Sequence, residues 1–323
     1  MGLLNFITTG KPKVDIRVPI DEKACLQKAI QWVKNNRVPG SGIKQSHNAD
    51  LITPEVTGYL IDSLYRVGEK EFAYDLTRWE ISVQKPDGAV GAPDGVPYTF
   101  DTAQVVHGYL AVLDDMPEVL PHLKRACDYV DRMITADGNV THETYDAWHL
   151  PDGTMLSEYG NLYVLPPMLK AGKKLNEPRY TAAAKRGMEF YRKKPDLVEF
   201  KPALAMLSHY FGYMMEALVD LGEFELAKKG LKQALALQKP DGSIPAHPGV
   251  NWVCSTGMAQ LAIAWYKLGD REPADKAMEY LFRLQNPSGG FYGGYGRGAN
   301  YFPKSEISWA AKFFIDACML RSK

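Results

Sequence analysis

The sequence predicts an all-α protein, a single (α/α)6 toroid of six helical hairpins in two concentric layers. Three observations lead to this prediction. A Gln-Lys-Pro-Asp-Gly phrase recurs along the chain, each copy follows an amphipathic helical segment, and segments that are apolar on nearly every side alternate with the amphipathic ones. Repeats of this length are typical of architectures built from one supersecondary unit that cannot bury its apolar face alone.

The recurring phrase sets the repeat length. It occurs at 84–88 and 238–242, returns as Gln-Asn-Pro-Ser-Gly at 285–289, and has weaker copies ending at Gly40 and Gly138. The five glycines are spaced by 48, 50, 104 and 47 residues, and the long gap holds Lys194-Pro195-Asp196 where a further copy is expected. The chain therefore contains six units of about 50 residues.

Each phrase ends a helix with one apolar stripe. In the last of these helices Ala277, Leu281 and Leu284 recur at helical spacing, whereas Lys276 and Glu279 face away. Such a stripe is typical of a helix that packs on a core and faces water on its other side. The six predicted outer helices are Glu22–Lys34, Glu71–Val83, Glu118–Ile134, Arg179–Lys193, Glu223–Leu237 and Glu272–Leu284.

The segments between them have no polar face, which predicts burial. These inner helices are expected at Thr53–Val67, Asp101–Leu113, Ser157–Ala171, Ala203–Leu221, Ser255–Leu268 and Ser305–Leu320. An open solenoid needs polar capping repeats at its ends, and neither end of this chain shows one. We therefore expect the six hairpins to close into a ring over residues 22–323, with residues 1–21 as an N-terminal extension.

This pattern resembles the α/α-toroid superfamily. The superfamily includes terpenoid cyclases and protein prenyltransferases, whose repeats carry a similar Gln…Asp-Gly phrase. It also includes carbohydrate-active (α/α)6 enzymes such as uronyl hydrolases, polysaccharide lyases and the helical domain of glucuronyl C5-epimerases. The resemblance covers residues 22 to 320 and is architectural.

Composition excludes several classes of partner and cofactor. Lys+Arg and Asp+Glu both number 38, which argues against a nucleic-acid partner. The four cysteines lie far apart, with no Cys-x-x-Cys pair, so we predict no metal site and no cofactor. The sequence contains no run of about 18 apolar residues, the length that a membrane span needs, and no signal-peptide pattern. We therefore expect a cytoplasmic protein.

The connections from outer to inner helix are long, and those from inner to outer helix are short. All long loops and all N-termini of inner helices should therefore share one end of the barrel, the long-loop end, where we place the functional site. Carboxylates near these N-termini could equally be first-turn residues that favour the helix dipole. The candidate catalytic residues are Glu55, Asp101, Glu158, Glu306 and His209.

Polar and aromatic residues in or beside these loops are candidates for substrate binding. Aromatic rings suit stacking on sugar rings, although such residues also anchor ordinary loops. The predicted substrate-binding residues are His47, Asp50, Gln104, His142, Tyr159, Tyr210, His247, Trp252 and Arg297.

Carbohydrate chemistry fits these residues better than terpenoid chemistry, because the acidic motif of the cyclases and the zinc ligands of the prenyltransferases are missing. A glycosidase needs two carboxylates, and a lyase or epimerase needs a base and a cation for the uronate carboxyl. Lys44, Lys201, Arg297 and Lys304 lie at the long-loop end. The sequence therefore predicts an enzyme acting on an acidic oligo- or polysaccharide; the alternative is a non-catalytic carbohydrate-binding or scaffold protein.

Overall fold

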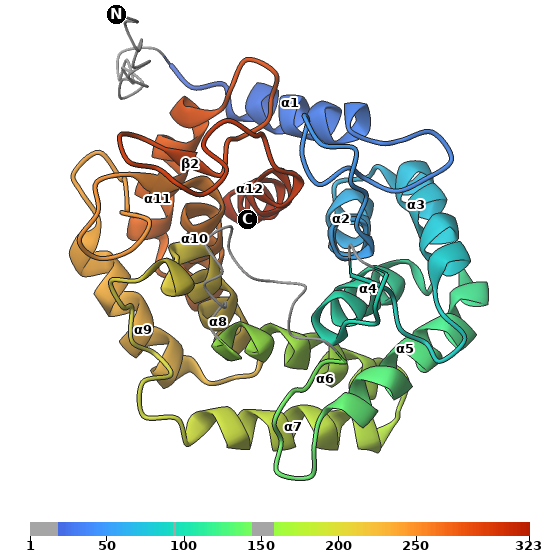
Figure 1. Cartoon of the computed structure of the whole chain (residues 1–323). Helices are drawn as coiled ribbons and strands as arrows, with labels where there is room; N and C mark the ends of the chain where they lie inside the picture. The colour runs from blue at the N-terminus through green and yellow to red at the C-terminus, as the bar shows by residue number, and fades with distance from the viewer. Residues whose placement is uncertain (1–18, 93–94, 144–157) are drawn as a thin grey trace, which may run out of the picture.

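The computed structural model describes residues 19–92, 95–143 and 158–323 and shows twelve α-helices there, arranged as two concentric rings (Figure 1). The outer helices are α1 (Glu22–Asn35), α3 (Lys70–Val83), α5 (Leu120–Met133), α7 (Pro178–Arg192), α9 (Phe224–Leu237) and α11 (Arg271–Leu284). The inner helices are α2 (Pro54–Arg66), α4 (Thr99–Val112), α6 (Leu165–Lys174), α8 (Ser208–Asp220), α10 (Ser255–Leu268) and α12 (Ser308–Arg321). The predicted (α/α)6 toroid is thus confirmed, whereas residues 1–18 of the predicted extension lie outside the described residues.

Burial follows the predicted division of the helices. In α11 the side chains of Ala274, Ala277, Met278 and Leu281 are buried and the opposite face is open to water. In α10 every residue from Ser255 to Trp265 is buried, because inner helices pack against neighbours on all sides.

Some inner helices begin later than the sequence suggests. The third opens with a 3-10 helix, η2 (Glu158–Val164), before α6 begins at Leu165. Pro166 and Pro167 lie in the first turn of α6, where a missing backbone N–H costs no helical hydrogen bond. Two further 3-10 turns, η1 (Pro117–Val119) and η3 (Leu204–Met206), precede α5 and α8.

The glutamine of the phrase joins its own unit to the next one. Gln84 Nε2 donates to the carbonyl of Gly88 and, at 3.0 Å, to the carbonyl of His122 in the next outer helix, α5. Gln285 makes the equivalent bond at 2.9 Å to the carbonyl of Cys25, which lies in α1. The junction between the sixth unit and the first is therefore built like an internal one, and the ring is closed.

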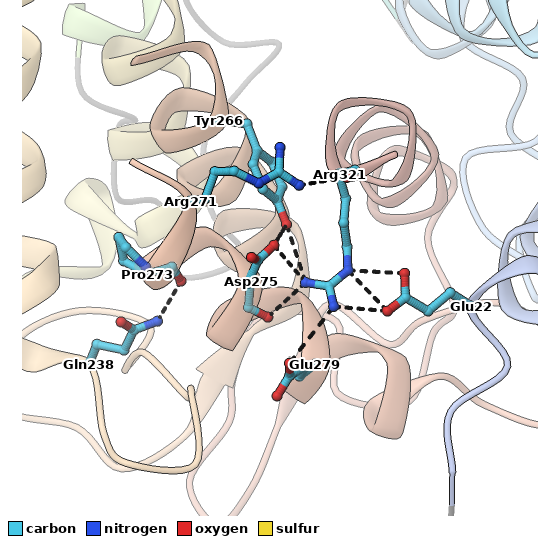
Figure 2. A network of polar contacts seen from close by, with 8 residues as sticks. All are labelled: Glu22, Gln238, Tyr266, Arg271, Pro273, Asp275, Glu279 and Arg321. Carbon is cyan, nitrogen blue, oxygen red and sulfur yellow. Dashed lines mark hydrogen bonds and ion pairs between the residues drawn. The ribbon is translucent and has the colours of Figure 1, made fainter. Parts of the chain in front are cut away.

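Arg321, at the end of α12, adds a second tie across this junction (Figure 2). Its guanidinium lies 2.8 Å from Glu22 Oε1 in α1 and 2.7 Å from Asp275 Oδ1 in α11. Tyr266 of α10 also donates to Asp275, at 2.6 Å. One arginine thus connects the first outer helix to the last hairpin.

Extended structure in the described residues is confined to the loops. The strands β1 (Val253–Cys254) and β2 (Gly294–Tyr295) pair antiparallel, with Val253 opposite Tyr295. Isolated bridges such as the one between Ser46 and Ile307 join other loops at the same end. These contacts hold the long loops over the N-termini of the inner helices.

Candidate functional site

Aromatic side chains from the inner ring meet on the barrel axis. The rings of Tyr163 and Phe313 lie 6.4 Å apart between centroids, Phe100 and Tyr213 5.3 Å, and Tyr59 and Phe313 6.0 Å. All five are buried. We call these five residues the axial cluster; they come from α2, α4, η2, α8 and α12. Figure 1 shows α2, α4, α8 and α12 around the centre of the ring.

Glu55 lies at the long-loop side of the axial cluster, in the first turn of α2 and one turn before Tyr59. Its side chain is 7% exposed, and no described residue donates a hydrogen bond to it. Burial raises the pKa of Glu55 to about 8, although the positive charge of Lys312 opposes the rise. Glu55 therefore keeps its proton at neutral pH, as a general acid must.

His209, in the first turn of α8, faces the same region. Its ring centroid lies 4.5 Å from that of Tyr213 and 6.1 Å from that of Phe313. Its Nδ1 is 2.6 Å from the side-chain oxygen of Gln260, which holds the ring in place. Burial lowers the pKa of His209 to about 3, so the imidazole is neutral.

Tyrosines complete this environment. Tyr210 is buried, and its ring lies 6.3 Å from that of Tyr301. Burial raises the pKa of both hydroxyls, and the charge of Glu55 adds to the effect on Tyr210. Of the predicted residues, Glu55, His209 and Tyr210 are therefore brought together.

Glu306 has a different place. Its carboxylate accepts hydrogen bonds from Trp32 Nε1 of α1 at 2.6 Å, Asn286 Nδ2 at 2.7 Å and Ser288 Oγ at 2.6 Å. Its backbone N–H donates to Nδ1 of His47, which is exposed. Glu306 thus lies where α1 meets the loop before α12, and exposed His47 binds the backbone of that loop.

Asp101 and Gln104 are fully buried in the first turns of α4. Burial raises the pKa of Glu80, on outer helix α3, and the negative charge of Asp101 raises it further. Asp101 therefore lies within electrostatic reach of the outer layer. Gln104 donates to the carbonyl of Phe100 at 3.2 Å.

The other predicted residues belong to the loops. Glu158 is 57% exposed and pairs with Lys194, and its neighbour Tyr159 donates to Asp196. Asp50 is exposed and pairs with Lys44 at 2.8 Å. The structure does not bring these residues to the axial cluster.

Among the loop aromatics, His142 stacks on Tyr98 with 4.2 Å between ring centroids, and burial lowers the pKa of His142 to about 4. Trp252 is buried and makes an edge contact with half-buried His247 at 6.2 Å. Arg297 is exposed. These residues form parts of the rim of the long-loop end.

The sequence reasoning overlooked Lys312. This lysine lies in α12 and is 4% exposed, with its ammonium 3.1 Å from Asp316 Oδ2. The sequence could have indicated this pair, because a Lys and an Asp lie four residues apart inside an otherwise apolar helix. Buried charges are rare unless they are paired.

No known protein family and no curated protein matches the sequence. Solved structures do match the fold. A novel alpha-amylase from Clostridium perfringens is 13% identical, with a TM-score of 0.69 over 95% of this chain and 100% of the other. A family 88 glycosyl hydrolase from Bacteroides vulgatus is 11% identical (TM-score 0.66; 93% and 98%), and a polysaccharide lyase is 13% identical (TM-score 0.62; 93% and 96%). At this identity the likeness establishes the fold.

Two further properties concern the described residues alone. None of their helices combines the length and apolar character needed to cross a membrane. Within the same ranges, no three His, Cys, Asp or Glu side chains are grouped so as to hold a metal ion.

Proposed function

We propose that the protein is a carbohydrate-active enzyme in which Glu55 transfers a proton to or from a sugar. The observation that carries this proposal is the place of Glu55: a buried carboxyl in the first turn of an inner helix, whose pKa burial raises and whose charge acts on Tyr210. The ring of His209 lies 5.2 Å from that of Tyr210. Groups whose pKa is shifted in this way are common at catalytic sites. Solved structures that share the fold include two enzymes of carbohydrate hydrolysis and a lyase.

In hydrolysis, Glu55 would protonate the glycosidic oxygen as the bond to the sugar breaks, and a second carboxylate would activate water or attack the sugar. Asp101 is our candidate for the second role, because it is the other predicted carboxylate buried in an inner helix. Glu158 and Glu306 rank lower, since one is exposed and the other is already held by three donors.

In elimination or epimerisation, a base must remove the proton next to a uronate carboxyl. His209 is the predicted residue that would act as this base, although burial lowers its pKa to about 3 and so weakens it in that role. Glu55 would protonate the leaving oxygen or the opposite face of the sugar. A uronate would also need a cation. Lys44 and Lys201 are paired with Asp50 and Asp196, whereas Arg297 is exposed and no described carboxylate pairs with it. An acidic sugar is therefore the substrate class that we favour.

The test is a screen of neutral and uronate-containing polysaccharides. Hydrolysis is detected by the appearance of new reducing ends, and elimination by the ultraviolet absorbance of unsaturated sugars. For the substrate found, Glu55→Gln should lower kcat by about a hundredfold or more, the usual contribution of a positioned acid or base. Glu225→Gln, an exposed change on outer helix α9, is the matched control. Full activity in Glu55→Gln would refute the assignment, and tight binding without turnover by the native chain would favour the carbohydrate-binding alternative.

A further inference from the structure

Lys312 lies where a cation is hardest to accommodate, inside the inner ring. Its ammonium is 3.6 Å from the ring centroid of Phe313 and 5.1 Å from that of Tyr59, both in the axial cluster. A buried ammonium costs several kcal/mol unless it is paired, and aromatic faces return part of that cost. The buried ammonium of Lys312 is therefore a candidate for a functional role.

Lys312 is held from behind by Asp316. The Asp316 carboxylate also accepts hydrogen bonds from Ser63 Oγ at 2.7 Å and from Arg66 Nη2 at 2.9 Å, both on α2. Burial opposes ionisation of Asp316, yet Lys312 and Arg66 together lower its pKa, so it stays ionised. Arg66 also pairs with Asp62 at 2.7 Å, so Asp316 shares Arg66 with a second carboxylate and holds Lys312 in place.

Lys312 and Glu55 are linked through Tyr59. Tyr59, over whose ring the ammonium lies, is one turn after Glu55 on α2, so both residues share a helix face. The positive charge of Lys312 lowers the pKa of Glu55, against the effect of burial. The tyrosines around Glu55, namely Tyr59 on α2, Tyr210 and Tyr213 on α8, and Tyr301 before α12, ionise well above neutral pH, and His209 is neutral.

We propose that Lys312 is a positioning residue: a clamped ammonium that stabilises the carboxylate which Glu55 becomes when it donates its proton. The proposal rests on the proposed function of Glu55. In the donation step, the O–H bond of Glu55 breaks, a bond forms between that proton and the sugar oxygen, and the electron pair remains on Glu55 as a negative charge. Lys312 compensates this charge, and it also keeps Glu55 able to ionise despite its burial.

Other titratable groups face Lys312 from the remaining inner helices. Glu216 of α8, whose pKa burial raises to about 7, and His107 of α4, whose pKa burial lowers, both experience its charge. Lys267 of α10 pairs with Asp220 at 2.8 Å. A measurement on Glu55 must therefore separate its signal from that of Glu216.

The experiment is an infrared titration of the carboxyl C=O band, in which the spectrum of a matched Glu55→Gln protein is subtracted for each variant. Lys312→Met should raise the titration midpoint of Glu55 by about one pH unit or more, the size of effect that an adjacent opposite charge has. Lys312→Arg should keep the midpoint near the native one. Lys170→Met, which removes a half-exposed inner-helix lysine paired with Asp220, is the control and should leave it unchanged.

Asp316→Asn should change the titration midpoint of Glu55 in the opposite direction, and it provides a test if the Lys312→Met protein does not fold. It removes the anion that competes for Lys312, so the midpoint of Glu55 should fall. Unchanged midpoints in Lys312→Met or in Asp316→Asn would overturn the proposal. The titration needs no substrate, so it tests the effect of Lys312 on Glu55 independently of any enzymatic activity. If the protein turned over no glycan, the proposed function would be wrong, and the titration would still show whether Lys312 acts on Glu55. With a substrate, Lys312→Met should lower kcat and move its pH profile in parallel with the midpoint, and Lys312→Arg should restore both.

Discussion

Glu55 and Glu306 occupy matching places in the first and last repeats and are equally buried, at 7% exposed, but their surroundings are opposite. No described residue donates a hydrogen bond to Glu55, whereas three donors hold Glu306. A carboxylate satisfied by its neighbours stabilises the structure, and an unsatisfied one is available for chemistry. The comparison teaches that a carboxylate at the start of an inner helix gains its role from the layer it faces.

The difference originates in how each helix begins. Pro54 starts α2 directly, so Glu55 is already in the first helical turn and faces the axis. Before α12 the chain remains extended until Ile307, and Glu306 pairs with Tyr292 in an antiparallel bridge. Successive side chains of an extended segment point to opposite sides. Ile307 is buried, and Glu306 points to Trp32 of the outer layer.

The largest effect on stability is expected at Glu306. Glu306→Ala leaves three donors around it without their acceptor, and hydrogen bonds to a charged group are individually worth about 1.5–3 kcal/mol. We expect a loss of about 4 kcal/mol in the free energy of unfolding, measured by urea denaturation. Glu55→Ala should lower the free energy of unfolding by clearly less. Equal losses in the two variants would contradict the contrast between Glu55 and Glu306.

The pH dependence of stability should distinguish the two residues next. Because the pKa of Glu55 in the folded protein is raised to about 8, the native chain loses stability as the pH rises from the ordinary carboxyl value towards 8. Glu55→Gln removes this penalty and should gain about 4 kcal/mol relative to the native chain between about pH 5 and about pH 9, because about three units of pKa difference take effect in that range at about 1.4 kcal/mol per unit. Thermal or urea melts at both pH values measure it. A gain that is the same at both would contradict the raised pKa.

A smaller effect is expected for Trp32→Phe, which removes a single donor to Glu306 and keeps most of the apolar surface. The cost should be about 1–2 kcal/mol in the free energy of unfolding. Combined with Glu306→Ala, the two losses should be less than additive, because both remove the same bond. Additive losses in a double-mutant cycle would show that the bond contributes nothing.

The fold was predictable because the information is repeated. The spacing of Gly88, Gly138, Gly242 and Gly289 and the alternation of helix types fix six hairpins, and Gln285 binds α1 as Gln84 binds α5. Side chains at corresponding positions of different repeats, in contrast, can point in different directions. Glu55 and Glu306 both precede or begin the apolar stretch of an inner helix, but one residue lies in a helix and the other in an extended bridge.

The site was therefore only partly predictable. Glu55, His209 and Tyr210 lie in one region because each is in the first turn of an inner helix. Glu158 and Asp50 lie in loops, whose geometry depends on long-range contacts such as those with Lys194 and Lys44.

The most direct test is a crystal structure of the Glu55→Gln protein with the saccharide that the native chain turns over. The account predicts a sugar at the long-loop end, with the amide introduced at position 55 within hydrogen-bond distance of a glycosidic or ring-substituent oxygen and Glu306 still bound to Trp32. A sugar bound on the outer layer, or one that contacts Glu306 in place of the side chain at position 55, would contradict it.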